Sequence, residues 1–226
     1  MAMTHRIEPI LHTVSIRDLR PTQITVGLRE VTRKRDAWRN RLNTPPFHDG
    51  KAGGEKADHG TKSAGEFLSS HMIPVVEGPG DTLWLIDHHH LARALDDEGV
   101  EDVLVSIIAK LNHLPKKRFF AFMDCHNWLH PYDEEGKRRD WVDLPRHVGK
   151  MVDDPYRSLA GEVRRAGGYA KTPVPYTEFL WADYFRDRVR RHAIESRFAR
   201  TVEKGVTLAK LPEAAHLPGF AGPSDD

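Results

Sequence analysis

An apolar segment followed by an aspartate and three consecutive histidines constrains the fold of this chain more than any other feature. Residues 82–86 are too uniformly apolar to face water on either side, which is typical of a strand inside a sheet. Asp87–His90 follows, and apolar residues at helical spacing begin at Leu91. Further apolar strands are predicted at residues 73–76 and 103–108. This order predicts an α/β domain in which four polar residues lie between a buried strand and a helix.

The C-terminal half of the chain predicts helices. Asp154-Pro155 combines an N-cap residue with a proline at the first helical position, and residues 176–204 carry apolar side chains at four-residue spacing, which predicts one long helix. Residues 43–66 contain many glycines and charged residues and almost no apolar ones, so a flexible loop is expected there. The predicted organisation is a core at 8–112 that includes this loop, a helical half at 113–205 packed on the core, and an extended tail at 206–226.

The charge balance limits the partners of the chain. It carries 34 basic and 33 acidic residues, so its net charge is +1 and any basic surface must be local. We therefore expect DNA binding to be weak and to fade steeply with added salt. No run approaches the ~18 apolar residues of a spanning helix and the N-terminus lacks an apolar signal segment, so we expect a cytoplasmic protein without a membrane partner. The sequence leaves the oligomeric state open.

The histidine-rich loop is suited to binding phosphate. Backbone amides at the start of a helix favour an anion, and Asp87 at the strand end can accept a proton or hold a divalent metal ion. His89 and His90 would donate to phosphate oxygens, and Arg93, one turn along, would supply a forked cation. Two alternatives stay open: Asp87 caps the helix beside partly exposed histidines, or Asp and His form a transition-metal site completed by a distant carboxylate.

Several segments together resemble a known superfamily. The chain is similar to the ParB/sulfiredoxin-like superfamily, and most of all to its branch of ParB-like putative nucleases. The resemblance extends over roughly residues 8–190 and rests on these segments: residues 19–23, 73–78, 87–90, 153–160, 167–169 and 178–183. It implies a compact α/β (α+β) fold, with a small mixed sheet and a helical C-terminal half, in which the loop before the helix binds nucleotide phosphates. Members of the superfamily include partition proteins that use CTP, sulfinic-acid reductases that use ATP, and free-serine kinases.

The loop departs from the enzymatic branches of the superfamily at identifiable positions. The kinase branch typically has Asp-Gly-His-His-Arg, whereas this chain has His88 in place of the glycine and Leu91 in place of the arginine. Gln23 stands where the kinases place an acidic residue, and an amide cannot abstract a proton. These differences argue against serine kinase activity. The reductase branch uses a loop cysteine, whereas the only cysteine here, Cys125, lies among apolar residues and is expected to be buried.

Taken together, these residues predict a phosphate or nucleotide site. We expect Asp87 to act as a base or to hold a metal, His89 and His90 to contact phosphate, and Arg93 to clamp it. The further phosphate-binding candidates are His88, Gln23, Arg157 and Ser158. For Arg157 an ordinary ion pair with Asp153 or Glu162 is the alternative. The expected function is nucleotide-dependent phosphoryl transfer or phosphodiester hydrolysis, with ATP, ADP or CTP and a divalent metal as candidate cofactors. The competing hypothesis is a non-enzymatic ParB-like protein that binds DNA or a partner.

Overall fold

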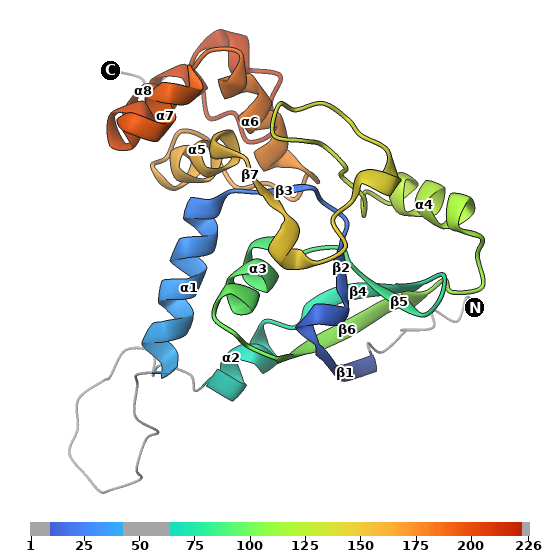
Figure 1. Ribbon diagram of the computed structural model, residues 1–226. Helices are drawn as coiled ribbons and strands as arrows, with labels where there is room; N and C mark the ends of the chain where they lie inside the picture. The colour runs from blue at the N-terminus through green and yellow to red at the C-terminus, as the bar shows by residue number, and fades with distance from the viewer. Residues whose placement is uncertain (1–9, 43–63, 223–226) are drawn as a thin grey trace, which may run out of the picture. The chain divides into compact units, whose positions relative to one another are not determined.

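The computed structural model describes residues 10–42 and 64–222, which divide into two compact units (Figure 1). The first unit contains the chain up to Thr22, Val31–Leu129 and Pro145–Lys150. The second contains Gln23–Glu30, His130–Leu144 and the chain from Met151 onward. The predicted boundary at residues 112 and 113 therefore falls inside the first unit, and most of the loop predicted at 43–66 lies outside the described residues.

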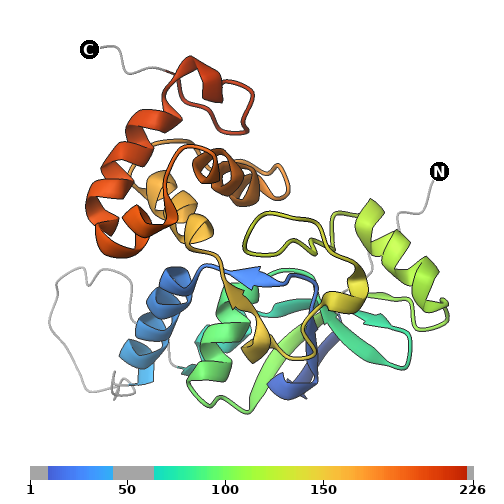
Figure 2. The same cartoon turned by 45° about the horizontal axis from the view of Figure 1, so that its top comes forward.

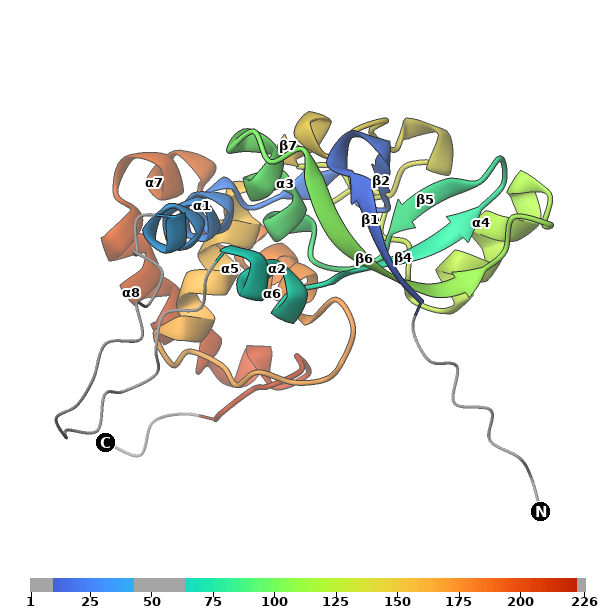
Figure 3. The same cartoon turned by 90° about the horizontal axis from the view of Figure 1, so that it is seen from below.

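The first unit is built on a mixed sheet of five strands, in agreement with the predicted α/β class. The strand order is β1-β6-β4-β5-β2, in which β1–β6 and β4–β5 are antiparallel and β4–β6 and β2–β5 are parallel. Figure 3 shows that this sheet is strongly curled. The strands are β1 (Ile10–Ser15), β2 (Leu19–Pro21), β4 (Ile73–Gly78), β5 (Thr82–Leu85) and β6 (Asp102–Lys110).

Helices of the first unit cover this sheet with apolar faces. Helix α3 (His89–Asp97) buries Leu91, Ala92, Ala94 and Leu95, the spacing that the sequence predicts. Helix α1 (Leu28–Leu42) begins in the second unit and continues in the first, where Trp38 lies 5.8 Å from the ring of Phe67 in α2 (Ala64–Ser70). Helix α4 (Lys116–Cys125) and the 3₁₀ turns Ile16–Asp18 and Val148–Lys150 complete the unit.

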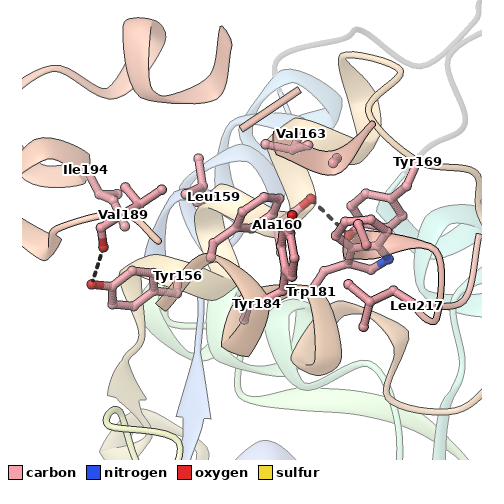
Figure 4. Packing of buried hydrophobic residues seen from close by; sticks show 14 residues of the cluster. Tyr156, Leu159, Ala160, Val163, Tyr169, Trp181, Tyr184, Val189, Ile194 and Leu217 are labelled. Carbon is pink, nitrogen blue, oxygen red and sulfur yellow. Dashed lines mark hydrogen bonds between the residues drawn. The ribbon is translucent and has the colours of Figure 1, made fainter. Parts of the chain in front are cut away.

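The second unit is mainly helical and has its own apolar core (Figures 2 and 4). Leu159, Val163, Trp181 and Phe185 have no measurable exposure. Its elements are the two-stranded parallel sheet of β3 (Thr25–Val26) and β7 (Val152–Asp153), the helices α5 (Pro155–Arg165), α6 (Thr177–Arg186), α7 (Arg191–Ser196) and α8 (Phe198–Ala209), and the 3₁₀ turns Trp141–Asp143 and Pro212–Ala214.

The predicted long helix at 176–204 is instead three helices, α6, α7 and α8. Helix α6 ends at Arg186, and Arg190 adopts an extended conformation with φ −69° and ψ 135° before α7 begins. The buried hydroxyl of Tyr156 donates to the Val189 carbonyl at 2.9 Å, so a distant side chain satisfies an acceptor that the broken helix leaves (Figure 4). Tertiary packing thus overrides the local periodicity.

The C-terminal segment also differs from the extended tail predicted at 206–226. Helix α8 continues to Ala209, and beyond it Leu217 is buried at 8% exposure. The indole Nε1 of Trp181 donates to the Pro218 carbonyl at 2.8 Å, and Phe220 pairs with Tyr169 in an isolated β-bridge. Because these contacts tie the segment to the core, it is packed through residue 220.

The Asp153–Ser158 segment caps two helices. Asp154 accepts from the Tyr156 N–H at 2.9 Å and so caps α5, as the sequence predicts. Asp153 accepts from the Leu28 N–H at 2.8 Å, and Ser158 Oγ lies 3.3 Å from the Arg29 nitrogen, which donates to it. The start of α1 therefore depends on residues far along the chain. No helix among the described residues is long and apolar enough to cross a membrane.

Candidate functional site

The Asp87–His88 loop connects the end of β5 to the start of α3. His88 precedes the helix in the left-handed conformation, with φ 63° and ψ 26°. Left-handed backbone favours glycine, which is the residue that the kinase-type loop has at this position. The carboxylate of Asp87 is exposed, and its Oδ1 accepts from the His88 N–H at 2.6 Å. Its Oδ2 makes no hydrogen bond to any residue that the structure describes.

His89 holds the loop in place. Its ring is 3% exposed, and Nε2 lies 3.3 Å from both the backbone nitrogen and Oγ1 of Thr22. Thr22 Oγ1 in turn donates to the Leu85 carbonyl at 2.7 Å, which ties the end of β5 to the residue after β2. This burial differs from the expectation that His89 faces a phosphate, because its ring is enclosed and already hydrogen-bonded.

The other predicted residues of α3 keep intermediate exposure. His90 is half-buried in the first turn. Arg93 Nε pairs with Asp97 Oδ1 at 2.9 Å, one turn along the same helix, and the Arg93 side chain is 17% exposed. The forked cation that the sequence predicts for phosphate is thus engaged with a carboxylate in this structure.

Two basic residues that sequence reasoning missed lie close to His88. Burial is the main cause that lowers the pKa of His88 below the usual histidine value; Asp87 opposes this shift, whereas the charges of Lys34 and His71 reinforce it. The ring also hydrogen-bonds to the backbone of Met72, and its Nδ1 is buried with no partner among the described residues. The loop therefore combines an exposed carboxylate with three basic side chains from different elements.

His71 is held in a defined orientation by the end of α2. Its Nδ1 lies 3.0 Å from the Phe67 carbonyl, and its ring stacks on Phe67 at 4.1 Å. The same Nδ1 also lies 3.0 Å from the Ser70 hydroxyl, so two contacts at the end of α2 hold the ring. In the sequence His71 was a single histidine before a strand, and Lys34 belonged to a basic stretch typical of a solvated helix face. Neither carried a local signal.

The residues around Asp87 do not form a metal site of three or more protein ligands. Within residues 10–42 and 64–222, no group of three or more His, Cys, Asp or Glu side chains converges in a way that could hold one. The metal role predicted for Asp87 therefore stays a prediction without a three-residue ligand group among the described residues, and we derive no step through a metal.

The remaining predicted residues gather in the second unit. Arg157 is 5% exposed; its Nη1 donates to Gln23 Oε1 at 3.2 Å and to the Thr25 carbonyl, and its guanidinium lies 3.9 Å above the Phe179 ring. Burial lowers the pKa of Arg157 to about 10. Neither alternative ion pair forms, because Asp153 caps α1 and Glu162 pairs with Arg165. Gln23, Arg157 and the capping Ser158 are thus brought together, where they anchor β3 and α1.

His130 lies in the same cluster and was also missed. Its ring contacts the rings of Tyr132, Tyr176 and Phe179, with centroids 3.8 to 4.4 Å apart. Burial and the charges of Arg157 and Arg138 lower the pKa of His130 to about 3. The histidine is therefore neutral at physiological pH, which suits its place beside a buried cation.

Comparison with known proteins supplies the family. The family described as "Putative ParB-like nuclease" matches residues 12–187. The chain belongs to this family. A solved relative, protein Atu1540 from Agrobacterium tumefaciens, is 44% identical; the match covers 96% of this chain and 98% of that one with a TM-score of 0.82. No curated protein matches the chain.

Membership of the ParB-like nuclease family confirms the resemblance that the sequence indicates. The matched residues include both the Asp87–His88 loop and the Gln23–Arg157 cluster. The fold agrees with the family assignment, since the mixed sheet and the helical C-terminal half are both present.

Proposed function

We propose that this ParB-like protein binds a phosphate group at the Asp87–His88 loop and hydrolyses a phosphodiester bond there. One observation carries the proposal: the exposed Asp87 carboxylate lies beside His88, on whose pKa Lys34 and His71 also act. A base next to several cationic or hydrogen-donating groups is the arrangement that phosphodiester hydrolysis needs. The family description points to the same chemistry.

Each residue has a distinct role in the proposed reaction. Lys34, His71 and the loop bind the phosphate oxygens and stabilise the charge that develops on them. Asp87 takes a proton from a water molecule as that water attacks phosphorus. The bond from phosphorus to the leaving oxygen breaks, the leaving oxygen takes a proton from solvent, and Asp87 returns its proton to solvent. The products are a phosphate monoester and a hydroxyl group.

The lowered pKa of His88 fits phosphate binding. Burial, reinforced by the charges of Lys34 and His71, lowers the pKa of His88 and so disfavours a further cation at the loop. A bound phosphate supplies negative charge and favours the protonated ring, so phosphate and proton bind cooperatively. By linkage, each unit by which phosphate raises the pKa corresponds to about 1.4 kcal/mol of coupling between phosphate binding and proton binding.

Nucleotide-dependent phosphoryl transfer would use the same loop, but three positions favour hydrolysis. His88 has a side chain in left-handed backbone where a glycine would let a nucleotide approach closely. Leu91 is 3% exposed and packs in the core where the kinase-type loop has its arginine. The Gln23 amide accepts from Arg157 and cannot act as a base.

Hydrolysis of bis(4-nitrophenyl) phosphate and of a labelled oligonucleotide tests the proposal. Asp87→Asn should keep phosphate affinity and lower turnover by about 10²- to 10⁴-fold, the usual contribution of a general base. Lys34→Gln should weaken phosphate binding. Asp102→Asn, which removes an exposed carboxylate of β6, is the matched control and should change neither.

A thermal-shift series with inorganic phosphate, ATP, ADP and CTP separates the ligands. A ligand present at 100 times its dissociation constant adds about 2.7 kcal/mol of stability, which such a scan resolves. Equal turnover by wild type and Asp87→Asn would remove Asp87 from the reaction. Nucleic-acid binding without hydrolysis by any variant would favour the non-enzymatic alternative.

A further inference from the structure

The packing of helix α4 does not explain which residues lie on its outer face. Phe119, Phe120 and Met123 form its buried face, and Phe119 and Phe120 both contact the ring of Trp84 in β5. Figure 1 shows α4 beside the β4–β5 hairpin. The opposite side of the helix is exposed and combines basic with aromatic side chains.

Three consecutive basic residues, Lys116, Lys117 and Arg118, occupy the first turn of α4. All three are exposed, and none makes a side-chain hydrogen bond or ion pair with a residue that the structure describes. The first turn contains no acidic residue, and Pro115 at the N-cap provides no side-chain cap. Cations at the start of a helix oppose its dipole. Helix stability therefore does not account for these charges, which remain available to an external anion.

Aromatic rings continue from these charges along one side of the helix. Arg118, Phe122 and His126 follow at intervals of four residues and so form a single row. The His126 ring stacks on Phe122 at 3.9 Å with an interplanar angle of 17°, and Trp128 lies 5.1 Å from His126. The Phe122 carbonyl lies 2.9 Å from Nδ1 of His126, which fixes the ring orientation. This platform of Phe122, His126 and Trp128 keeps exposed or half-buried faces.

A basic helix start that leads, through Arg118, into stacked rings matches the chemistry of single-stranded nucleic acid. Exposed bases stack on aromatic faces, whereas phosphates pair with lysine and arginine. Duplex nucleic acid is a poorer match, because its base faces are stacked on each other. An acidic protein is also a poorer match, because its binding would not use the aromatic platform. The acidic residue of α4, Asp124, lies two positions from Phe122 and therefore off the row of Arg118, Phe122 and His126, on the side of the helix that carries Lys117.

We propose that the outer face of α4 binds single-stranded nucleic acid, through Lys117 and Arg118 on phosphates and through the Phe122–His126–Trp128 platform on bases. Binding is independent of base sequence, because stacking and phosphate contacts read no base edges. The role of this face in holding a substrate for cleavage rests on the proposed function, whereas the binding itself does not.

Fluorescence anisotropy with labelled oligo(dT) and a duplex of equal length tests this surface. Lys117→Gln combined with Arg118→Gln should weaken oligo(dT) binding at least tenfold at low salt. It should also make the log–log salt slope less steep by about 1.4, since each phosphate contact on a single strand contributes about 0.7. His126→Ala should weaken binding about fivefold or more by loss of stacking. Arg200→Gln combined with Lys204→Gln, at two exposed basic positions of α8, is the matched charge control and should have little effect.

The possible results separate this proposal from the proposed hydrolysis. Unchanged oligo(dT) affinity in the α4 double variant, an equal loss in the α8 control, or tighter binding of the duplex would each overturn it. If oligo(dT) binds through α4 but neither substrate is hydrolysed, the proposed function fails and this surface stands. If Asp87→Asn abolishes hydrolysis of the small diester while the α4 variant binds like wild type, only this surface fails.

Discussion

Replacing Arg186 by methionine should destabilise the protein by about 3–5 kcal/mol, because it leaves a buried carboxylate without its cation. Asp154 is 2% exposed, and its Oδ2 lies 2.8 Å from Arg186 Nη2. Arg186 also donates to the Glu134 carbonyl at 2.6 Å and lies 4.7 Å from the centroid of the Tyr156 ring. After the substitution Asp154 keeps the Tyr156 N–H as a donor, which does not balance a buried negative charge.

Urea unfolding followed by tryptophan fluorescence measures this loss. The expected loss corresponds to a decrease of roughly 6–20 °C in Tm for a chain of this size. The control is Arg191→Met, which removes an ion pair to Glu195 of 3.0 Å whose side chains are 48% and 53% exposed. Exposed pairs of this kind contribute at most about 1 kcal/mol.

A double-mutant cycle decides whether the uncompensated charge is the cause. Asp154→Asn in the Arg186→Met background removes that charge and should recover part of the lost stability. Equal effects of Arg186→Met and Arg191→Met, or no recovery on adding Asp154→Asn, would refute the reasoning.

Three further predictions concern other parts of the molecule. The pKa of His130 is about 3, below the ~6.5 of an unfolded histidine, so protons bind the unfolded chain more tightly. Wild type should therefore lose stability as pH falls below ~6.5. In urea titrations the loss relative to His130→Phe should reach up to about 1.4 kcal/mol per pH unit. Gly205→Ala should destabilise the protein by about 1–3 kcal/mol, since the new Cβ would lie 2.4 Å from Val163 Cγ2. The control is Gly161→Ala, whose Cβ would have its nearest contact at 3.6 Å. In the same assay this control should be neutral or stabilising by up to about 1 kcal/mol. Cys125 is exposed, so a thiol reagent should modify one thiol per chain without denaturant; protection until unfolding would contradict its exposure.

The local part of the fold could be predicted from the sequence, because its signals lie within a few residues of each other. The apolar runs at 73–76, 82–86 and 103–108 are strands, and the periodicity after Leu91 is a helix. The start of α5 followed from Asp154 and Pro155 alone. The predicted burial of Cys125 was wrong, since apolar sequence neighbours do not determine which side of a helix faces the core.

The part of the fold that depends on contacts between separate elements could not be predicted, because its partners lie outside any local sequence pattern. Arg157 meets Gln23 across 134 positions, and nothing near either residue indicates the pairing. Lys34 and His71 approach His88 from separate elements over shorter separations, and the local sequence does not indicate these contacts either. The loop predicted at Asp87–His90 lies at the junction of β5 and α3, but α3 already begins at His89, so only Asp87 and His88 precede the helix. The burial of His89 depends on Thr22, which follows β2.

The caps on α1 determine when that helix can be completed during synthesis. Leu28 and its cap Asp153 are 125 residues apart, and β3 pairs with β7 over a similar separation. At 5–20 residues per second, a ribosome needs about 6–25 s after Leu28 to deliver the capping residue. Until then α1, which carries Lys34, lacks this cap and has only its own weak helical tendency at its first turn. The Asp87–His88 loop is therefore synthesised several seconds before the start of α1, the helix that carries Lys34, can be capped.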